Sequence, residues 1–147
     1  QNYKSTKELI RLLVRTASKG ANLLLNIGPQ PNGELPTTAL DRLKGIGAFL
    51  NGKAGESIYC TLGGNINIGD SIVTTKGKGK NAPLYIHILA DEPTADVTLS
   101  IPGKIRRAIN LLTGEKILFR RNNNGKTTFA TSNHKANEFD YIIKVEF

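Results

Sequence analysis

The stretch Asn22-Leu23-Leu24-Leu25-Asn26-Ile27-Gly28-Pro29 decides the predicted fold. Three consecutive leucines do not alternate with polar residues, so the pattern differs from that of a strand with one solvent-exposed face. A short continuous apolar run that ends at Gly-Pro is typical of a strand covered on both faces, as in a parallel sheet. Because one strand cannot form a sheet, the sequence predicts that its partners lie outside these 147 residues and that the chain is a fragment.

A helical pattern precedes this stretch. Apolar residues recur at helical spacing between residues 9 and 17. Ser5 and Glu8 have the spacing of a capping box, in which each satisfies a backbone group at the start of a helix. Gly20 is placed to end the helix in the left-handed conformation.

A second helical pattern follows the stretch, from residue 36 to residue 50. Two glycines lie inside it, Gly45 and Gly47, and each costs about 1 kcal/mol relative to alanine in a helix. We interpret them as positions of close packing against a neighbour. The order helix, strand, helix is that of an α/β fold.

Beyond residue 56 the pattern changes to short β-rich runs that are separated by turn sequences such as Asn124-Gly125. Short strands at regular spacing are typical of an antiparallel sandwich. We therefore predict an α/β remnant over residues 1–56, followed by an all-β antiparallel sandwich domain over residues 57–147. The predicted strands cover residues 57–61, 71–75, 83–89, 97–101, 105–111, 116–120, 126–131 and 141–147.

Composition restricts the classes of partner and site. The chain has 20 Lys+Arg against 12 Asp+Glu, a net charge of +8, but the cations are dispersed and do not interleave with aromatic residues. Solvated surface charge is therefore favoured over nucleic-acid binding. No apolar run has the length of a membrane-spanning helix. The single cysteine, Cys60, excludes an internal disulfide framework, and without a nearby histidine or helix start it is expected to be a buried, inert thiol.

No motif in the sequence carries a complete chemistry. The lysine–glycine loop at residues 76–80 could cradle a phosphate, although a flexible hairpin tip also explains it. His87 and His134 are far apart and lack a carboxylate cluster, so we predict neither a metal site nor a cofactor, and His87 is interpreted as an ordinary strand histidine. Glycoside hydrolysis needs two carboxyl groups that face one sugar. Asp91 and Glu92 are explained by a turn, and no catalytic residue is predicted in this chain.

Two segments match a known family pattern: YKSTKELIRLLVRTASKGANLLLNIGPQPNGELP, from Tyr3, and GESIYCT, from Gly55. They resemble the end of the catalytic domain of retaining α-L-fucosidases, in which corresponding segments read close to YKS-x-x-ELI-x-x-LV-D-x-VSKGGN-x-LLN-I/V-GP-x-P-x-G-x-I-P and NGE-A/S-IYGT. The remaining residues match the C-terminal β-sandwich of that family more loosely. The chain departs from the pattern where the family has Asp, Gly, Trp and Gly, at Arg15, Ala21, Phe49 and Cys60.

The resemblance implies a catalytic β/α barrel of which residues 22–27 form the last strand. It implies hydrolysis of terminal α-L-fucose from glycans by a retaining mechanism, with an aspartate nucleophile and an acid/base that both lie upstream, so that the isolated fragment is expected to be inactive. Asn26 and Gly28, at the C-terminal end of that strand, are placed near the rim of the substrate pocket. The expected partners are a fucosylated glycan, through the complete enzyme, and either the missing N-terminal barrel segment or a second copy of the chain. A periplasmic or secreted location is expected.

Two alternatives remain open. The β-rich half could be a carbohydrate-binding or structural β-sandwich module without hydrolytic activity, or a basic interaction domain whose binding to DNA would depend steeply on salt. Sugar binding would need exposed aromatic side chains, and there is no tryptophan. Most of the available aromatic residues lie within strand patterns; the available ones are Tyr59, Tyr85, Phe119, Phe129, Phe139, Tyr141 and Phe147.

Overall fold

The computed structural model describes residues 4–22, 30–92, 95–132 and 139–147. Two α-helices, α1 (Thr6–Ser18) and α2 (Thr37–Asn51), and a short 3-10 helix, η1 (Lys53–Ser57), precede the strands. The strands are β1 (Thr61–Gly63), β2 (Ile72–Gly77), β3 (Leu84–Ile88), β4 (Val97–Leu99), β5 (Arg107–Asn110), β6 (Phe119–Arg121), β7 (Thr127–Phe129) and β8 (Tyr141–Glu146).

Helix α1 begins and ends as predicted. The Ser5 hydroxyl accepts a hydrogen bond from the Glu8 backbone N–H at 3.1 Å, and the Glu8 carboxylate accepts one from the Ser5 backbone N–H at 3.3 Å, which completes the capping box. Gly20 follows the helix with φ of +74°. On the inner face Ile10 and Val14 are fully buried. The amphipathic pattern of this segment therefore corresponds to a real packing face.

Helix α2 confirms only part of the predicted packing. A Cβ atom at Gly45 would lie 2.5 Å from Cγ2 of Thr6 on α1, so this glycine does allow a close approach between the helices. At Gly47 no atom of the described residues lies within 4 Å of such a Cβ, so the predicted close packing is not found against this part of the chain. Leu40 and Leu43 belong to the apolar pattern of α2, but their exposed fractions are 40% and 38%. The described part of the chain therefore leaves one apolar face of α2 uncovered.

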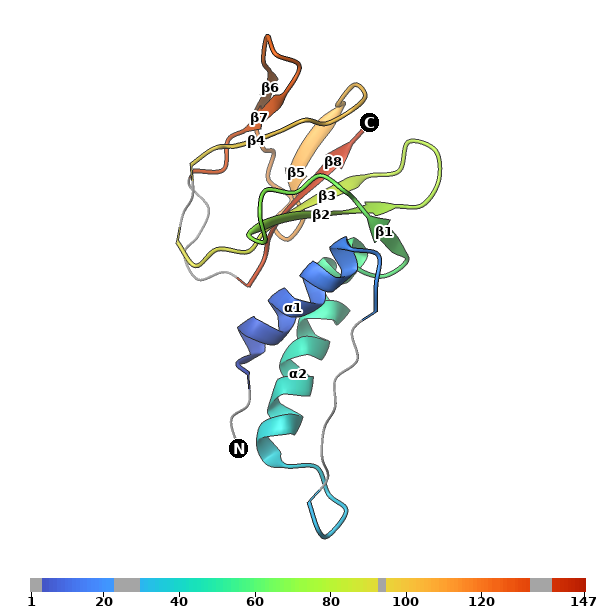
Figure 1. Ribbon diagram of the computed structural model, residues 1–147, viewed down its shortest axis with the longest axis vertical. Helices are drawn as coiled ribbons and strands as arrows, with labels where there is room; N and C mark the ends of the chain where they lie inside the picture. Colours follow the sequence, from blue (N-terminus) through green and yellow to red (C-terminus); the bar gives the residue numbers. More distant parts are fainter. Residues whose placement is uncertain (1–3, 23–29, 93–94, 133–138) are drawn as a thin grey trace.

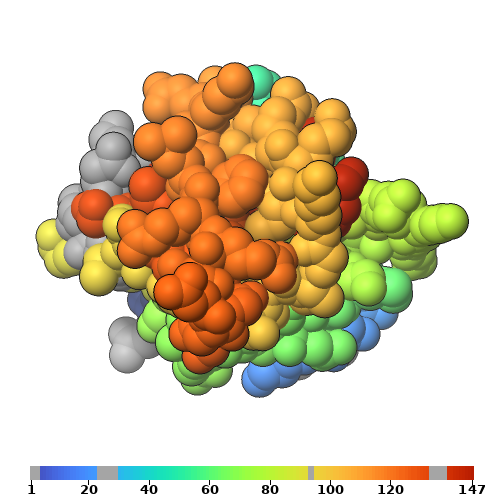
Figure 2. Space-filling model, turned by 90° about the horizontal axis from the view of Figure 1, so that it is seen from above, coloured from blue at the N-terminus to red at the C-terminus, as the bar shows by residue number. Residues whose placement is uncertain are grey.

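The strands form two antiparallel sheets, as expected of a sandwich (Figure 1). The larger sheet has the order β1-β2-β3-β8-β5 and the smaller one β4-β7-β6. The predicted runs overlap β2 to β8, but the run at residues 57–61 was placed wrongly: Ser57 ends η1, and β1 begins only at Thr61. Gly55 explains the difference, because a side chain there would collide with the Leu50 carbonyl group and η1 could not fold back on the end of α2. Seen from above, the gold and orange segments that carry β4 to β7 form most of the visible surface (Figure 2).

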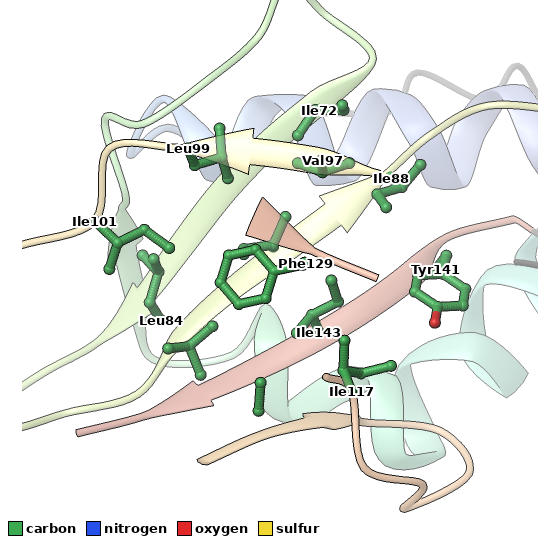
Figure 3. Packing of buried hydrophobic residues seen from close by; sticks show 13 residues of the cluster. Ile72, Leu84, Ile88, Val97, Leu99, Ile101, Ile117, Phe129, Tyr141 and Ile143 are labelled. Carbon is green, nitrogen blue, oxygen red and sulfur yellow. The ribbon is translucent and has the colours of Figure 1, made fainter. Parts of the chain in front are cut away.

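A hydrophobic core fills the space between the two sheets, with Phe129 of β7 near its centre (Figure 3). Phe129 has no exposed surface. Leu84, Ile86 and Ile88 on β3 point into this core, whereas Tyr85 and His87 point to the opposite face of the larger sheet, as the alternation in the sequence predicts.

The helices cover that opposite face. Ile10 and Val14 of α1 and Ile46 of α2 form one buried cluster with Val73 of β2 and Leu89, which follows β3. The larger sheet is therefore covered on both sides, and every residue of β3 is buried. Figure 1 shows the resulting three layers: a helix pair, a large sheet and a small sheet.

The leucine-rich strand predicted at residues 22–27 lies almost entirely outside the described residues. Its burial and its pairing therefore stay predictions. The division into domains at residue 56 also stays a prediction, although the cluster that contains Ile10 and Leu89 includes side chains from both sides of this boundary.

Candidate functional site

The sequence-predicted pocket residues, Asn26 and Gly28, lie outside the described residues, as does His134. Among the described residues, no group of three or more His, Cys, Asp or Glu side chains is arranged to hold a metal ion. No helix of the described segments is long and apolar enough to cross a membrane. The candidate sites are therefore the polar groups that the fold brings together.

A fully or almost fully buried chain of four polar residues lies between the helices and the larger sheet. His87 Nδ1 lies 2.6 Å from Asp140 Oδ2, and His87 Nε2 lies 2.8 Å from Thr75 Oγ1. Thr75 Oγ1 in turn lies 2.6 Å from the Ser57 carbonyl oxygen. His87, Thr75 and Ser57 have no exposed surface, and Asp140 has 1%. This series of contacts resembles the acid–histidine–hydroxyl arrangement of nucleophilic catalysis.

The hydrogen-bond partners determine where the protons lie. The Ser57 carbonyl can only accept, so the Thr75 hydroxyl donates to it and must accept from His87 Nε2. The remaining proton lies between His87 Nδ1 and Asp140, either as a neutral pair or as an imidazolium–carboxylate pair. Burial raises the pKa of Asp140, and the adjacent His87 opposes that shift. Burial outweighs the opposing effect of His87, so the pKa of Asp140 lies above that of an ordinary aspartate.

This chain of hydrogen bonds does not have the access that catalysis requires. The Thr75 hydroxyl proton is committed to the Ser57 carbonyl, and the side chain lies inside a covered sheet, where no substrate can reach it. We therefore assign it a structural role: it ties β2, β3 and the residue before β8 to the end of η1. Asp140 was missed in the sequence, because 53 positions separate it from His87 and it follows a polar segment with no periodic pattern.

A second polar group surrounds Lys144 on β8. Its Nζ lies 2.6 Å from Glu56 Oε2 and 3.9 Å from Glu146 Oε1, and the Tyr85 hydroxyl donates to Glu56 at 2.7 Å. Partial burial opposes the ionisation of Glu56, but the hydrogen bonds from Lys144 and Tyr85 outweigh it and lower its pKa. The hydrogen bond from Arg107 likewise lowers the pKa of Glu146. Both carboxyls are thus held as anions, whereas a glycosidase acid must keep its proton.

Asp91 connects α1 to the turn after β3. Its Oδ1 accepts from Lys7 Nζ at 2.7 Å and from Arg11 at 2.8 Å, and these two hydrogen bonds lower its pKa. Arg11 also donates to the Phe139 carbonyl at 3.1 Å, beside Asp140. The turn explanation for Asp91 was therefore incomplete: this carboxylate also anchors α1 to the turn after β3.

The comparisons with known proteins agree with this geometry. The sequence profile of the alpha-L-fucosidase family matches residues 1–55. The plasma alpha-L-fucosidase of Rattus norvegicus is 43% identical over 60 residues, which are 41% of this chain and 13% of that protein. The alpha-L-fucosidase of Branchiostoma floridae is 29% identical over 101 residues, which are 69% of this chain and 22% of that protein.

Solved structures extend the likeness to nearly the whole chain. Alpha-L-fucosidase isoenzyme 1 of Paenibacillus thiaminolyticus superimposes with a TM-score of 0.81 at 27% identity, over 99% of this chain and 35% of that one. The fold is also that of an alpha-L-fucosidase of Bacteroides thetaiotaomicron, with a TM-score of 0.84 at 22% identity, over 99% of this chain and 33% of that one. This chain is an α-L-fucosidase-like region. It spans about a third of the solved fucosidase chains and a smaller share of the curated relatives.

The departures of this fucosidase-like region from the family pattern have visible consequences. Cys60 was expected to be buried but is exposed, and its φ is +57°. That left-handed conformation favours glycine, the residue of the family pattern at this position. Arg15, where the pattern has aspartate, donates to the Asp70 carbonyl at 2.9 Å, so the changed charge contacts a loop rather than the core.

Proposed function

We propose that this fucosidase-like region forms the C-terminal end of an α-L-fucosidase, a retaining glycoside hydrolase that releases terminal α-L-fucose from glycans. The observation that carries the proposal is the coincidence of a family match over residues 1–55 with structural likeness to fucosidases over 99% of the chain. The nucleophile and the acid/base then belong to the part of the enzyme that precedes this region, and the region itself is inactive.

The state of the carboxyl groups supports the proposal that the catalytic residues lie upstream of this region. Glu56 and Glu146 are held as anions by lysine and arginine, and Asp91 is neutralised by Lys7 and Arg11. Asp140 keeps a raised pKa but is sealed from solvent. None of these four combines a retained proton with access to a sugar, which is the requirement for the acid of a glycosidase.

The region would complete and support the catalytic barrel. Residues 22–27 supply its last strand in this proposal, with Asn26 and Gly28 at the rim of the sugar pocket. The uncovered leucines Leu40 and Leu43 of α2 would contact the upstream part of the barrel. We place the boundary between barrel and sandwich near residue 56, and the enzyme in the periplasm or outside the cell.

A fluorogenic α-L-fucoside tests the proposal directly. The purified chain should release no fluorophore above the buffer background, whereas the Paenibacillus thiaminolyticus enzyme, as positive control, turns the substrate over. The enzyme's activity should be abolished by a fucose-like inhibitor, which confirms that the assay reports a fucoside site. Turnover by this chain alone, suppressed by the same inhibitor, would overturn the proposal that the region lacks a catalytic site.

The alternative is a carbohydrate-binding sandwich without hydrolytic activity. It has less support than the fucosidase proposal, because the aromatic side chains named below form no shared surface on which a sugar could stack. Tyr85, Phe129 and Tyr141 are buried. Tyr59 and Phe119 are exposed but lie in different layers, after η1 and on β6, so they do not form one stacking platform. A sugar site in the sandwich would therefore need another surface.

A further inference from the structure

A groove with a volume of about 750 Å³ opens at one end of the sandwich. Its size is that of a ligand pocket rather than that of a site for a single small ion. One wall is the β2–β3 hairpin, with Lys76 and Asn81, and the other is the segment that runs from Pro102 to Arg106. In Figure 2 the dark red C-terminal residues lie between the gold segment and the yellow-green hairpin that projects to the right.

Hydrogen bonds to backbone carbonyl groups hold both walls of the groove in place. The Gly77 N–H donates to the Pro83 carbonyl at 2.9 Å and closes the hairpin. The Arg121 guanidinium donates to the Gly103 carbonyl at 2.7 Å and to the Ile101 carbonyl at 3.3 Å, which fixes the turn of the second wall. The groove is therefore built by the fold rather than by loosely placed surface side chains.

The floor of the groove is apolar. Leu84, Ile66 and Phe147 line it and also pack on the core between the sheets. Lys76 pairs with Leu84 across β2 and β3, so its side chain leaves the sheet on the same side as the core and faces the groove. An apolar floor beneath a cationic wall suits a ligand that has both an apolar face and anionic groups.

The charge of the groove is positive. Lys76, Lys104 and Arg106 line it, and no acidic side chain does so in the part of the chain that the structure describes. Lys76 and Lys104 form no ion pair with any described residue. Arg106 contacts Glu146 at 3.1 Å, but Arg107 binds the same carboxylate at 2.9 Å, so Arg106 is only partly neutralised.

We propose that this groove binds an anionic oligosaccharide, with sulfate or carboxylate groups on Lys76, Lys104 and Arg106 and a sugar ring over the apolar floor at Phe147. The anionic character of the ligand rests on the groove alone. Its being a saccharide rests on the proposed function as part of a glycosidase. The apolar C–H face of a pyranose fits a floor with one aromatic ring, whereas consecutive nucleic-acid bases require several stacking rings.

Calorimetric titration of the whole chain tests the proposal with four probes of similar length. These are a heparin-derived tetrasaccharide, a tetragalacturonate, the neutral maltotetraose and a four-residue oligothymidylate. The sulfated probe, the carboxylated probe or both should bind, and maltotetraose should not. Binding should weaken as the ionic strength rises from about 0.01 to about 0.15 M, because the Debye length falls from about 30 to about 8 Å.

Two double variants distinguish binding inside the groove from non-specific attraction of an anion to the positively charged chain. Lys76→Gln with Lys104→Gln removes two lining charges and should weaken binding of the anionic saccharide about tenfold. Lys78→Gln with Lys80→Gln removes the same charge from the hairpin tip, outside the lining, and should change affinity less than about twofold. All four lysines are exposed, so both variants are expected to fold, and thermal melts check that they do.

The outcomes distinguish failure of the groove from failure of the proposed function. Absence of binding by every anionic probe, or equal losses in the two double variants, would overturn the groove as a site. Tighter binding of the oligothymidylate than of both saccharides would leave an anion site but overturn its assignment to sugars. Amide shifts on saccharide binding that are confined to the groove walls, including Asn81 and Gly103, would support the proposal. The fluorogenic assay tests the fucosidase assignment separately.

Discussion

Asp140 shows how much a single buried carboxyl can contribute to this fold. With His87 on β3 and Thr75 on β2 it links two strands and the residue before β8 to the Ser57 carbonyl, in a place where no water competes for the hydrogen bonds. Buried polar chains of this kind stabilise a structure only while every member keeps its partner. Removing one partner of a buried pair costs about 3 kcal/mol or more, since the other is left without compensation.

Asp140→Asn should change how stability depends on pH. The pKa of Asp140 is raised in the folded protein above its unfolded value of about 3.9, so its contribution is fully present below about pH 4 and is lost as pH rises toward the folded pKa. His87 is common to both proteins and can accept from the asparagine amide. The free energy of unfolding of the wild type minus that of the variant should therefore fall with rising pH, by at most about 1.4 kcal/mol per unit.

Urea unfolding at several pH values between 4 and 7 measures this difference. Asp96→Asn is the control, because hydrogen bonds from the Ser132 and Thr131 backbone lower the pKa of Asp96. The contribution of Asp96 is present above about pH 4 and is lost as pH falls below it, which is the opposite sign. A wild-type to Asp140→Asn difference that stays constant from pH 4 to 7 would contradict the raised pKa.

At the scale of elements, the two helices have different relations to their surroundings. Helix α1 buries Ile10 and Val14 against the larger sheet and is anchored at its side by Asp91. Helix α2 contacts α1 at Gly45 but leaves Leu40 and Leu43 exposed. Of its two interior glycines, Gly45 is packed against α1 and Gly47 is not. Alanine substitutions at the two positions can therefore be compared directly.

Gly47→Ala should raise the free energy of unfolding by about 0.5–1 kcal/mol, because alanine is the better helix former and no atom of the described segments lies within 4 Å of the new Cβ. Gly45→Ala gains the same propensity but places its Cβ 2.5 Å from Thr6 Cγ2. We expect it to be less stable than Gly47→Ala by about 1 kcal/mol or more. Thermal and urea unfolding compare the two variants, and equal stabilisation by both would contradict the close approach of the helices.

The whole molecule is a large sheet with a helix pair on one face and a small sheet on the other (Figure 1). The sandwich core and the helix cluster use opposite faces of β2 and β3, so the helices and the sandwich are expected to unfold together. The α2 face around Leu40 and Leu43 is left exposed. Because this chain spans about a third of the solved fucosidases, we propose that the upstream barrel covers that face.

The chain alone should therefore self-associate through α2 as its concentration increases, since no barrel shields the leucines. Leu40→Glu with Leu43→Glu should reduce the association measured by light scattering. Leu112→Glu with Leu118→Glu is the control, because these exposed leucines belong to the sandwich, and it should leave association unchanged. A wild-type chain that stays monomeric at high concentration would contradict the prediction.

The sequence by itself determined both helices, the approximate positions of strands β2 to β8 and the likeness to α-L-fucosidases. Each of these depends on local signals, such as the capping box at Ser5 and Glu8, or on an ordered motif. Local signals failed at residues 57–61, where β-forming residues lie at the end of a 3-10 helix because Gly55 permits a close approach to Leu50. They also failed at Cys60, whose left-handed turn leaves it exposed.

Only the tertiary structure decided which polar and charged groups meet. His87 contacts Thr75 and Asp140, which are 12 and 53 positions away, and the groove joins Lys76 to Lys104 from opposite walls. No periodicity encodes such pairings, because they arise from the order in which antiparallel strands lie in a sheet. Burial then acts on the assembled groups: it raises the pKa of Asp140, while exposure at the open end of the sandwich leaves two lysines available to a ligand.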